Sequence, residues 1–73
     1  MKPLIIDTRN TEAYMPIVTA IEGICKAPAG QIVHVLMHDD VSFHELKRYL
    51  IAHHIGFREI YDVDTVRIEF TQP

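Results

Sequence analysis

The strongest nucleophile in this 73-residue chain is the thiol of Cys25, the single cysteine. A thiolate can carry sulfur or exchange disulfides when it is exposed and electrostatically stabilised. Cys25 follows Val18 and Ile21 at helical spacing, which places it on the apolar side of a helix. It also lies near the end of that helix, where the helix dipole disfavours a thiolate. We therefore expect Cys25 to be buried in the core and inert rather than to act as a sulfur carrier.

Five histidines make a metal site the next chemistry to weigh. His34 and His38 are four residues apart, but four residues of a strand span about 13 Å, so the two rings cannot hold one ion without other ligands. His53 and His54 are adjacent and would point about 100° apart on a helix. We predict no metal and no cofactor. The alternative is a metal site whose ligands come from distant parts of the sequence and are brought together by the fold. His54 is expected at the end of a helix, where a protonated imidazole is stabilising.

Three aspartates that follow expected strands, Asp7, Asp39 and Asp40, are candidates for an acidic catalytic cluster. Acidic residues at strand ends more often cap the next turn or helix through their carboxylates. The sequence contains no complete catalytic constellation that would make use of them. We therefore predict no catalytic residues and a function in binding rather than in catalysis.

A set of residues around two strand ends is the better candidate for a functional site. It comprises Arg9, Glu12, Tyr14, Pro16, His38 and Asp39. If the two strands are parallel, their carboxyl ends and the N-termini of the following helices meet at one edge of the sheet, where anionic and polar ligands bind. Arg9 and His38 would supply donors there to a protein partner or to a small polar or anionic ligand. The alternative is a solvated loop with one structural Arg–Asp pair.

The first half of the chain contains the elements that would build this edge. The apolar run 4–6 predicts a short buried strand, and the β-branched run 32–37 predicts a central strand with two apolar faces. Between them, Pro16 opens a helical pattern that ends at the turn 28–30. Gly23 weakens this helix by roughly 1 kcal/mol relative to alanine, and a close approach to the sheet is one reason for a glycine there.

The second half predicts a helix followed by a hairpin. Ser42 and Glu45 have the spacing of a capping box, so we expect a helix from Ser42 with Gly56 as its C-cap. Two strand patterns follow, 57–61 and 65–70, which a short polar turn joins. The predicted fold class is α+β, a two-layer α/β sandwich of order βαβαββ with two helices on one face of a four-stranded mixed sheet. The length predicts a single domain over residues 1–73.

Composition limits the partners and the location that we expect. Seven Lys and Arg against ten Asp and Glu give a formal charge of −3, so we predict no nucleic-acid partner, although similar βαβαββ layers bind RNA. One cysteine excludes an intramolecular disulfide, which suits a reducing compartment, and we expect a cytoplasmic protein. The N-terminal apolar run is short, so neither a signal peptide nor a membrane span is expected.

The order of these elements, and the residues at which they begin and end, resemble the TusA/SirA-like family from Leu4 to Phe70. The matching segments are Asp7-Thr8-Arg9, Ala13-Tyr14-Met15-Pro16, Pro28-Ala29-Gly30, Asp39-Asp40 and Gly56. The resemblance implies a sulfur-carrier architecture, in which a Cys-Pro-x-Pro segment opens the first helix and its cysteine thiolate carries sulfur.

This chain departs from that pattern at the residue that matters most for the chemistry. With Pro16 placed on the second proline of the motif, Ala13 stands at the cysteine position, and a methyl group cannot carry a persulfide. The chain is most similar to a branch of the same fold that lacks the cysteine and has Asp-x-Arg after the first strand and His-Asp after the second. We expect a non-enzymatic binding or accessory module; the alternative is a sulfur-transfer or redox-linked protein that works with a partner's cysteine.

Overall fold

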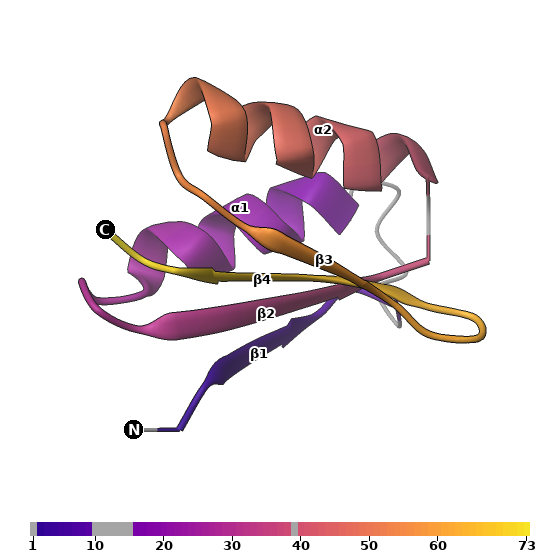
Figure 1. Ribbon diagram of the computed structural model, residues 1–73, viewed down its shortest axis with the longest axis horizontal. Coiled ribbons are helices and arrows are strands. Elements are labelled where there is room, and N and C mark those ends of the chain that lie inside the picture. Colours follow the sequence, from indigo (N-terminus) through magenta and orange to yellow (C-terminus); the bar gives the residue numbers. More distant parts are fainter. Residues whose placement is uncertain (1, 10–15, 39) are drawn as a thin grey trace.

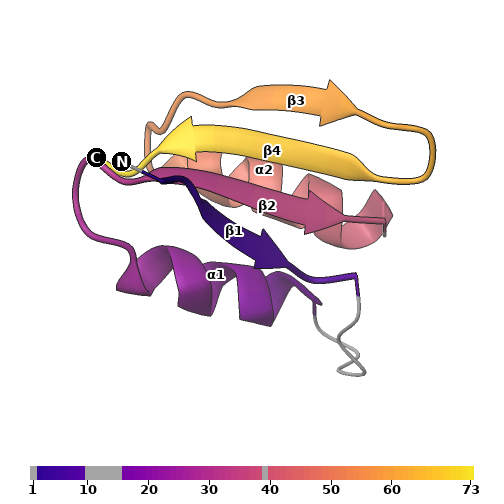
Figure 2. The same ribbon diagram turned by 90° about the horizontal axis from the view of Figure 1, so that it is seen from below.

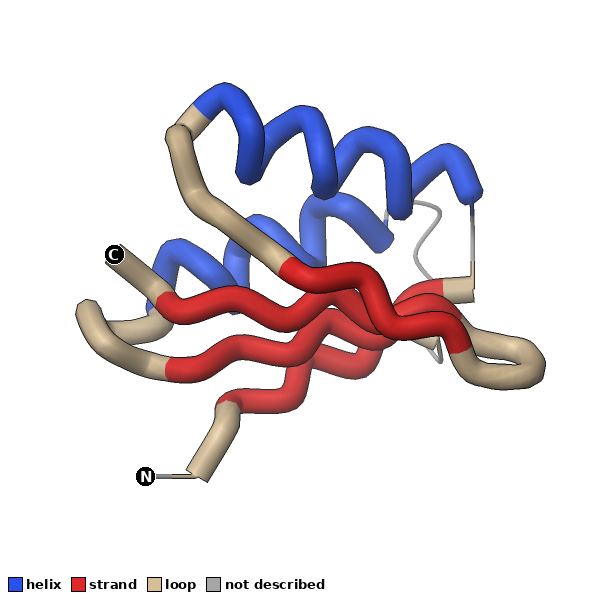
Figure 3. Tube along the Cα trace, viewed as in Figure 1, coloured by secondary structure: helices blue, strands red, loops and turns tan. Residues whose placement is uncertain are grey.

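The computed structural model describes residues 2–9, 16–38 and 40–73, and these form two layers (Figure 1). One layer holds the helices α1, Pro16–Lys26, and α2, Asp40–Ala52. The other is a sheet, and both helices lie against the same face of it (Figure 3). The predicted order βαβαββ is confirmed. No helix of the described residues is both long enough and apolar enough to cross a membrane.

The sheet has the strand order β1-β2-β4-β3. Its strands are β1, Leu4–Asp7; β2, Ile32–Met37; β3, Arg58–Tyr61; and β4, Val66–Thr71. Strands β1 and β2 pair in parallel, because α1 carries the chain back between them, whereas β4 pairs antiparallel with both β2 and β3. The predicted mixed sheet is therefore confirmed, with β2 and β4 in its centre.

The core lies between the helices and one face of the sheet. Alternate residues of β2 and β4 point into it, while α1 and α2 supply residues at helical spacing. Its fully buried members include Val33, Val35, Ile24, Leu46, Leu50 and Ile68. Gly23 has the predicted close approach to the sheet, because a Cβ at this position would lie 2.6 Å from Cδ1 of Ile6.

Strand β1 is not the buried strand that its sequence predicts. Leu4 is 37% exposed and Ile5 is 58% exposed, and only Ile6 belongs to the core. The reason is topological, since β1 lies at the edge of the sheet and pairs with β2 alone. Among the described elements only the helix layer covers the strand, so one of its faces stays open, and its short length keeps the exposed edge small.

Both ends of α2 differ from the prediction. The helix begins at Asp40 rather than at Ser42, which is buried in the first turn. At the other end, His54 and not Gly56 has the left-handed backbone conformation, with φ of 58°. The amide of Ile55 donates to the carbonyl of Leu50 and the amide of His54 donates to that of Ile51, which is the Schellman pattern. His54 therefore ends the helix through its backbone.

Candidate functional site

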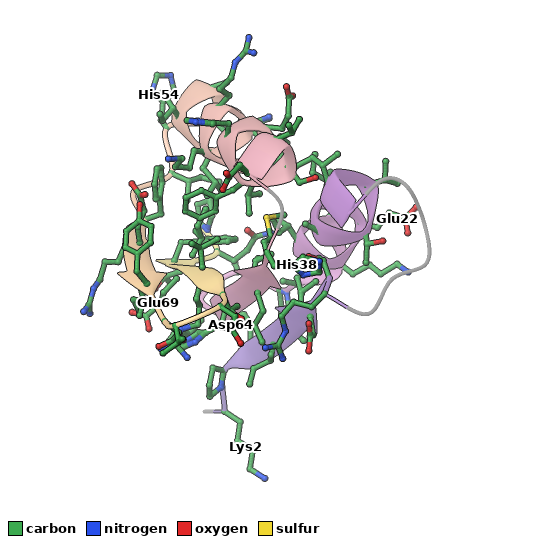
Figure 4. All side chains as sticks on the ribbon, turned by 90° about the vertical axis from the view of Figure 1, so that its right-hand side faces the viewer. Lys2, Glu22, His38, His54, Asp64 and Glu69 are labelled. Atoms are coloured by element: carbon green, nitrogen blue, oxygen red, sulfur yellow. The ribbon has the colours of Figure 1, made fainter. Side chains whose placement is uncertain are left out.

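Arg9 and His38 lie together at the end of the sheet where β1 and β2 finish. They line an open pocket of about 540 Å³ with Asp64 and Thr65, which come from the turn between β3 and β4. Figure 4 shows His38 and Asp64 at this end of the molecule. Because β4 is the antiparallel neighbour of β2, its first residues arrive beside the last residues of β2. The site thus gathers residues from three segments of the chain.

The position of Arg9 is fixed by the residues just before it. The amide and the hydroxyl of Thr8 both donate to the carbonyl of Leu36, at 3.0 and 2.7 Å, and this continues the β1–β2 pairing past the end of β1. Thr8 is buried, so the next residue points away from the core. Arg9 is thereby held on the open side of the sheet, above the end of β2.

Asp7 and Arg9 form a bidentate ion pair in this site. The guanidinium donates from Nε to Oδ1 at 2.9 Å and from its terminal NH2 group to Oδ2 at 2.8 Å, and the Arg9 amide also donates to Oδ1. These hydrogen bonds lower the pKa of Asp7 from 3.8 to about 2, with a smaller electrostatic contribution from His38. They also raise the pKa of Arg9. The predicted alternative of one Arg–Asp pair is therefore present in the structure.

The ion pair determines what the site can bind. Asp7 offsets the charge of Arg9 and occupies two of its nitrogen donors, while the remaining NH1 group donates weakly to Thr65 Oγ1 at 3.4 Å. A ligand would therefore meet directed hydrogen-bond donors from Arg9 and His38 rather than a strong net positive charge. Asp64 adds a hydrogen-bond acceptor to the lining of the pocket.

Several residues of the predicted site lie outside the described residues. These are Glu12, Tyr14 and Asp39. Pro16 begins α1, as its position in the sequence predicts. Asp64 and Thr65 were missed, because they are distant in sequence from the two strand ends and only the hairpin brings them there. The one signal for them was the polar turn between the last two strands.

Cys25 is exposed, so the prediction of a buried thiol is wrong. The buried side of α1 is formed by Ala20, Ile24 and Ala27, and Cys25 lies about 100° further around the helix than Ile24. This turns the thiol toward α2, where Tyr49 lies. The pKa of Tyr49 is raised, first by burial and then by the charge of Cys25 and a hydrogen bond with it. The Tyr49 ring also stacks at a tilt on His53, with 4.3 Å between centroids.

The histidine within β2, His34, has a structural partner. His34 Nε2 lies 3.1 Å from Oε2 of Glu69 on β4, directly across from it in the sheet. Within residues 2–9, 16–38 and 40–73, no three His, Cys, Asp or Glu side chains gather in a way that would hold a metal ion.

The comparison with family models decides the family. The model for sulfurtransferase TusA matches residues 4–71, which is nearly the whole chain. This chain belongs to the TusA family. The family match agrees with the resemblance found from the order of the elements and the residues at their ends. The comparison with curated proteins gave no match, and neither did the comparison with solved structures.

Proposed function

We propose that this TusA-family chain is a non-enzymatic binding or accessory module, whose binding edge includes Arg9 and His38. The observation that carries the proposal is the pocket that these two residues line with Asp64 and Thr65. The sequence supports the non-enzymatic part, because Ala13 stands where the family motif has its cysteine. In this proposal the architecture of a sulfur carrier serves to hold a partner or a small polar or anionic ligand.

Inorganic phosphate is a suitable first probe for this edge, because it offers acceptors to both donors and can donate to Asp64. The amide resonances of Thr65 and His38 should shift on titration of the isotopically labelled protein. His38→Ala and Arg9→Ala should each weaken binding about tenfold, which corresponds to about 1.4 kcal/mol. His44→Ala is the matched control, since His44 is exposed on α2. Equal affinity in all four proteins would place the binding surface elsewhere.

The second candidate function is sulfur transfer through Cys25, and the exposure of this thiol favours it. Cys25 is the penultimate residue of α1, so it lacks the support of a helix N-terminus that the family motif provides. A sulfur atom could still reach it from a partner's persulfide by attack of the Cys25 thiolate on the terminal sulfur. The partner's thiolate would then be the leaving group.

One assay separates the two candidates. The chain is incubated with a cysteine desulfurase and cysteine, and its intact mass is measured. The binding proposal predicts no added sulfur on the native chain, whereas sulfur carriage predicts a gain of one sulfur atom that Cys25→Ser abolishes. Ala13→Cys in the Cys25→Ser background is the positive control for a thiol at the family position.

A further inference from the structure

The face of the sheet opposite the helices is uncovered by any described element, as the views in Figures 1 and 2 agree. Side chains that alternate away from the core form this open face. They are Ile5, Asp7, Ile32, His34, Leu36, Arg58, Ile60, Arg67, Glu69 and Thr71. Four of them are isoleucine or leucine, and one of these, Ile5, is more than half exposed. The open face therefore exposes apolar side chains to solvent, as surfaces that bind a partner often do.

The strand register places the charged members of the open face in two rows. In the first row, Glu69 on β4 lies between His34 and Arg58, and its carboxylate oxygens are 3.1 Å from His34 Nε2 and 3.5 Å from Arg58 NH1. The carboxylate of Glu69 is therefore paired within the first row. The second row runs from Asp7 through Leu36 and Arg67 to Ile60.

Arg67 in the second row has no carboxylate partner among the residues that the structure describes. Asp7 is the carboxylate of that row, but it is bound to Arg9, and Leu36 lies between it and Arg67. The direct neighbours of Arg67 are the apolar side chains of Leu36 and Ile60. Its Nε is buried, and among the described residues it is the single buried side-chain nitrogen or oxygen without a hydrogen bond.

The contrast with the other arginines makes this arrangement informative. Arg9, Arg48 and Arg58 each have a carboxylate within 3.9 Å. No ion pair joins Arg67 to a residue in the described part of the chain. A buried polar atom without a partner is costly in a folded protein, so such atoms are rare and call for an explanation. The terminal NH groups of Arg67, unlike Nε, are not buried without a partner, so they are the donors that a carboxylate of a docked molecule would meet.

We propose that the open face docks a protein partner through a segment that places an Asp or Glu carboxylate on Arg67 and apolar side chains around it. Charge complementarity supports this choice, because both carboxylates of the open face are already paired, and of its two arginines Arg58 has a carboxylate partner whereas Arg67 has none among the described residues. Leu36 and Ile60 would pack against the apolar side chains that flank the acid. Their burial would also strengthen the ion pair by excluding water.

The shape of the open face fits the same occupant. A depression of about 320 Å³ lies at the end where β2 begins, and four residues of the open face line it: Ile32, Arg58, Glu69 and Thr71. An apolar side chain two or more residues from the acid would have a place there.

Two other occupants fit less well. Single-stranded RNA on a sheet of this kind stacks its bases on aromatic side chains, and the open face has no Phe, Tyr or Trp, while the imidazole of its His34 lies 3.1 Å from Glu69. A second copy would have to offer a free carboxylate from the same face to Arg67, and the two carboxylates of the open face, Asp7 and Glu69, are already in ion pairs. An acidic, apolar protein segment is therefore the occupant to which we commit. The proposal does not depend on the edge formed by Arg9 and His38.

The test uses a displayed library of random peptides, selected on the full-length chain. Enriched peptides should carry an Asp or Glu flanked by apolar residues. For the best synthetic peptide, Arg67→Gln should raise the Kd tenfold or more. Arg48→Gln, which removes the same charge from α2, should leave the Kd within about twofold. His38→Ala should also leave it unchanged, and this separates failure of the open face from failure of the Arg9 and His38 edge.

The acid in the peptide gives a second arm that needs no variant of the chain. Its exchange for Asn or Gln should cost as much as Arg67→Gln does, and the two changes together should cost no more than one alone. The proposal is overturned if no peptide is enriched, if enriched peptides lack an acid, or if binding is indifferent to Arg67. It is also overturned if Arg67→Gln abolishes binding of a single-stranded RNA probe, or abolishes a dimer seen by sedimentation.

Discussion

Gly23 in the middle of α1 allows two opposing contributions to stability to be measured against each other. Replacement by alanine favours the helix by about 1 kcal/mol, because glycine has the larger backbone entropy in the unfolded chain. The new methyl group would, however, lie 2.6 Å from Cδ1 and 3.1 Å from Cγ1 of Ile6. Real Cβ atoms do not approach another carbon that closely, so either Ile6 or α1 must move.

The cost of that movement decides the sign of the change. Ile6 is the core residue of β1 and lies beneath α1, so its side chain has little free space. Overpacking of a well-filled core costs about 1–3 kcal/mol. We therefore expect Gly23→Ala to destabilise the protein by about 1 kcal/mol overall. For a domain of this size, that lowers the unfolding temperature by roughly 4–8 °C.

Ile6→Val supplies the matched background, because it removes Cδ1, the atom in the closest contact. Alone it should cost about 0.5–1.5 kcal/mol. In the Ile6→Val background, Gly23→Ala should become neutral or stabilising, so the double-mutant cycle should show a favourable coupling of about 1 kcal/mol or more. Urea unfolding followed by circular dichroism measures all four free energies. The reasoning is refuted if Gly23→Ala stabilises the wild-type chain, or if the coupling is zero.

Four further outcomes follow from individual residues. A thiol reagent should label Cys25 in the native chain at nearly the rate seen in urea, because the residue is exposed; strong protection would contradict the structure. Arg9→Gln should raise the pKa of Asp7 from about 2 toward 3.8 in a carbon-detected NMR titration. Since the folded pKa is the lower one, the ion pair contributes its full stability above pH 3.8 and loses it as the pH falls through about 2, a loss that Arg9→Gln should not show. His54→Gly should stabilise the protein by about 0.5–1 kcal/mol in thermal unfolding, because glycine adopts a φ of 58° without strain; no gain would contradict the assignment of His54 to the Schellman motif. Arg67→Met should stabilise the isolated chain by about 1 kcal/mol, because it removes a buried donor that has no acceptor, and a clear loss of stability would mean that Arg67 has a structural role.

The sequence by itself determined the layout of the fold. Period-two alternation in 65–70 and the β-branched run in 32–37 predicted β4 and β2, and helical spacing predicted α1. Hydrophobic periodicity is a property of the local sequence, so it can be recognised without knowledge of the tertiary structure. The family's characteristic residues at the ends of the elements could also be recognised from the sequence, and so could the alanine at the position of the family cysteine.

The helix ends were harder to predict than the helix itself. Ser42 and Glu45 have a capping-box spacing, but α2 starts at Asp40, and the left-handed conformation falls on His54 although Gly56 is nearby. Several local sequences can satisfy the free groups of a helix end at similar cost. The choice between them depends on where the chain must go next, here toward β3.

Only the tertiary structure decided which side chains are exposed and which meet. A rotation of about 100° on α1 separates exposed Cys25 from buried Ile24, and sequence spacing alone did not fix which side faces the core. Thr65 meets Arg9 although 56 residues separate them, because β4 is inserted beside β2. The isolation of Arg67 likewise follows from strand order, which places Leu36 and Ile60 beside it and leaves Asp7 to Arg9. Periodicity specifies the elements, whereas long-range pairing specifies their neighbours and therefore the surfaces that a partner would meet.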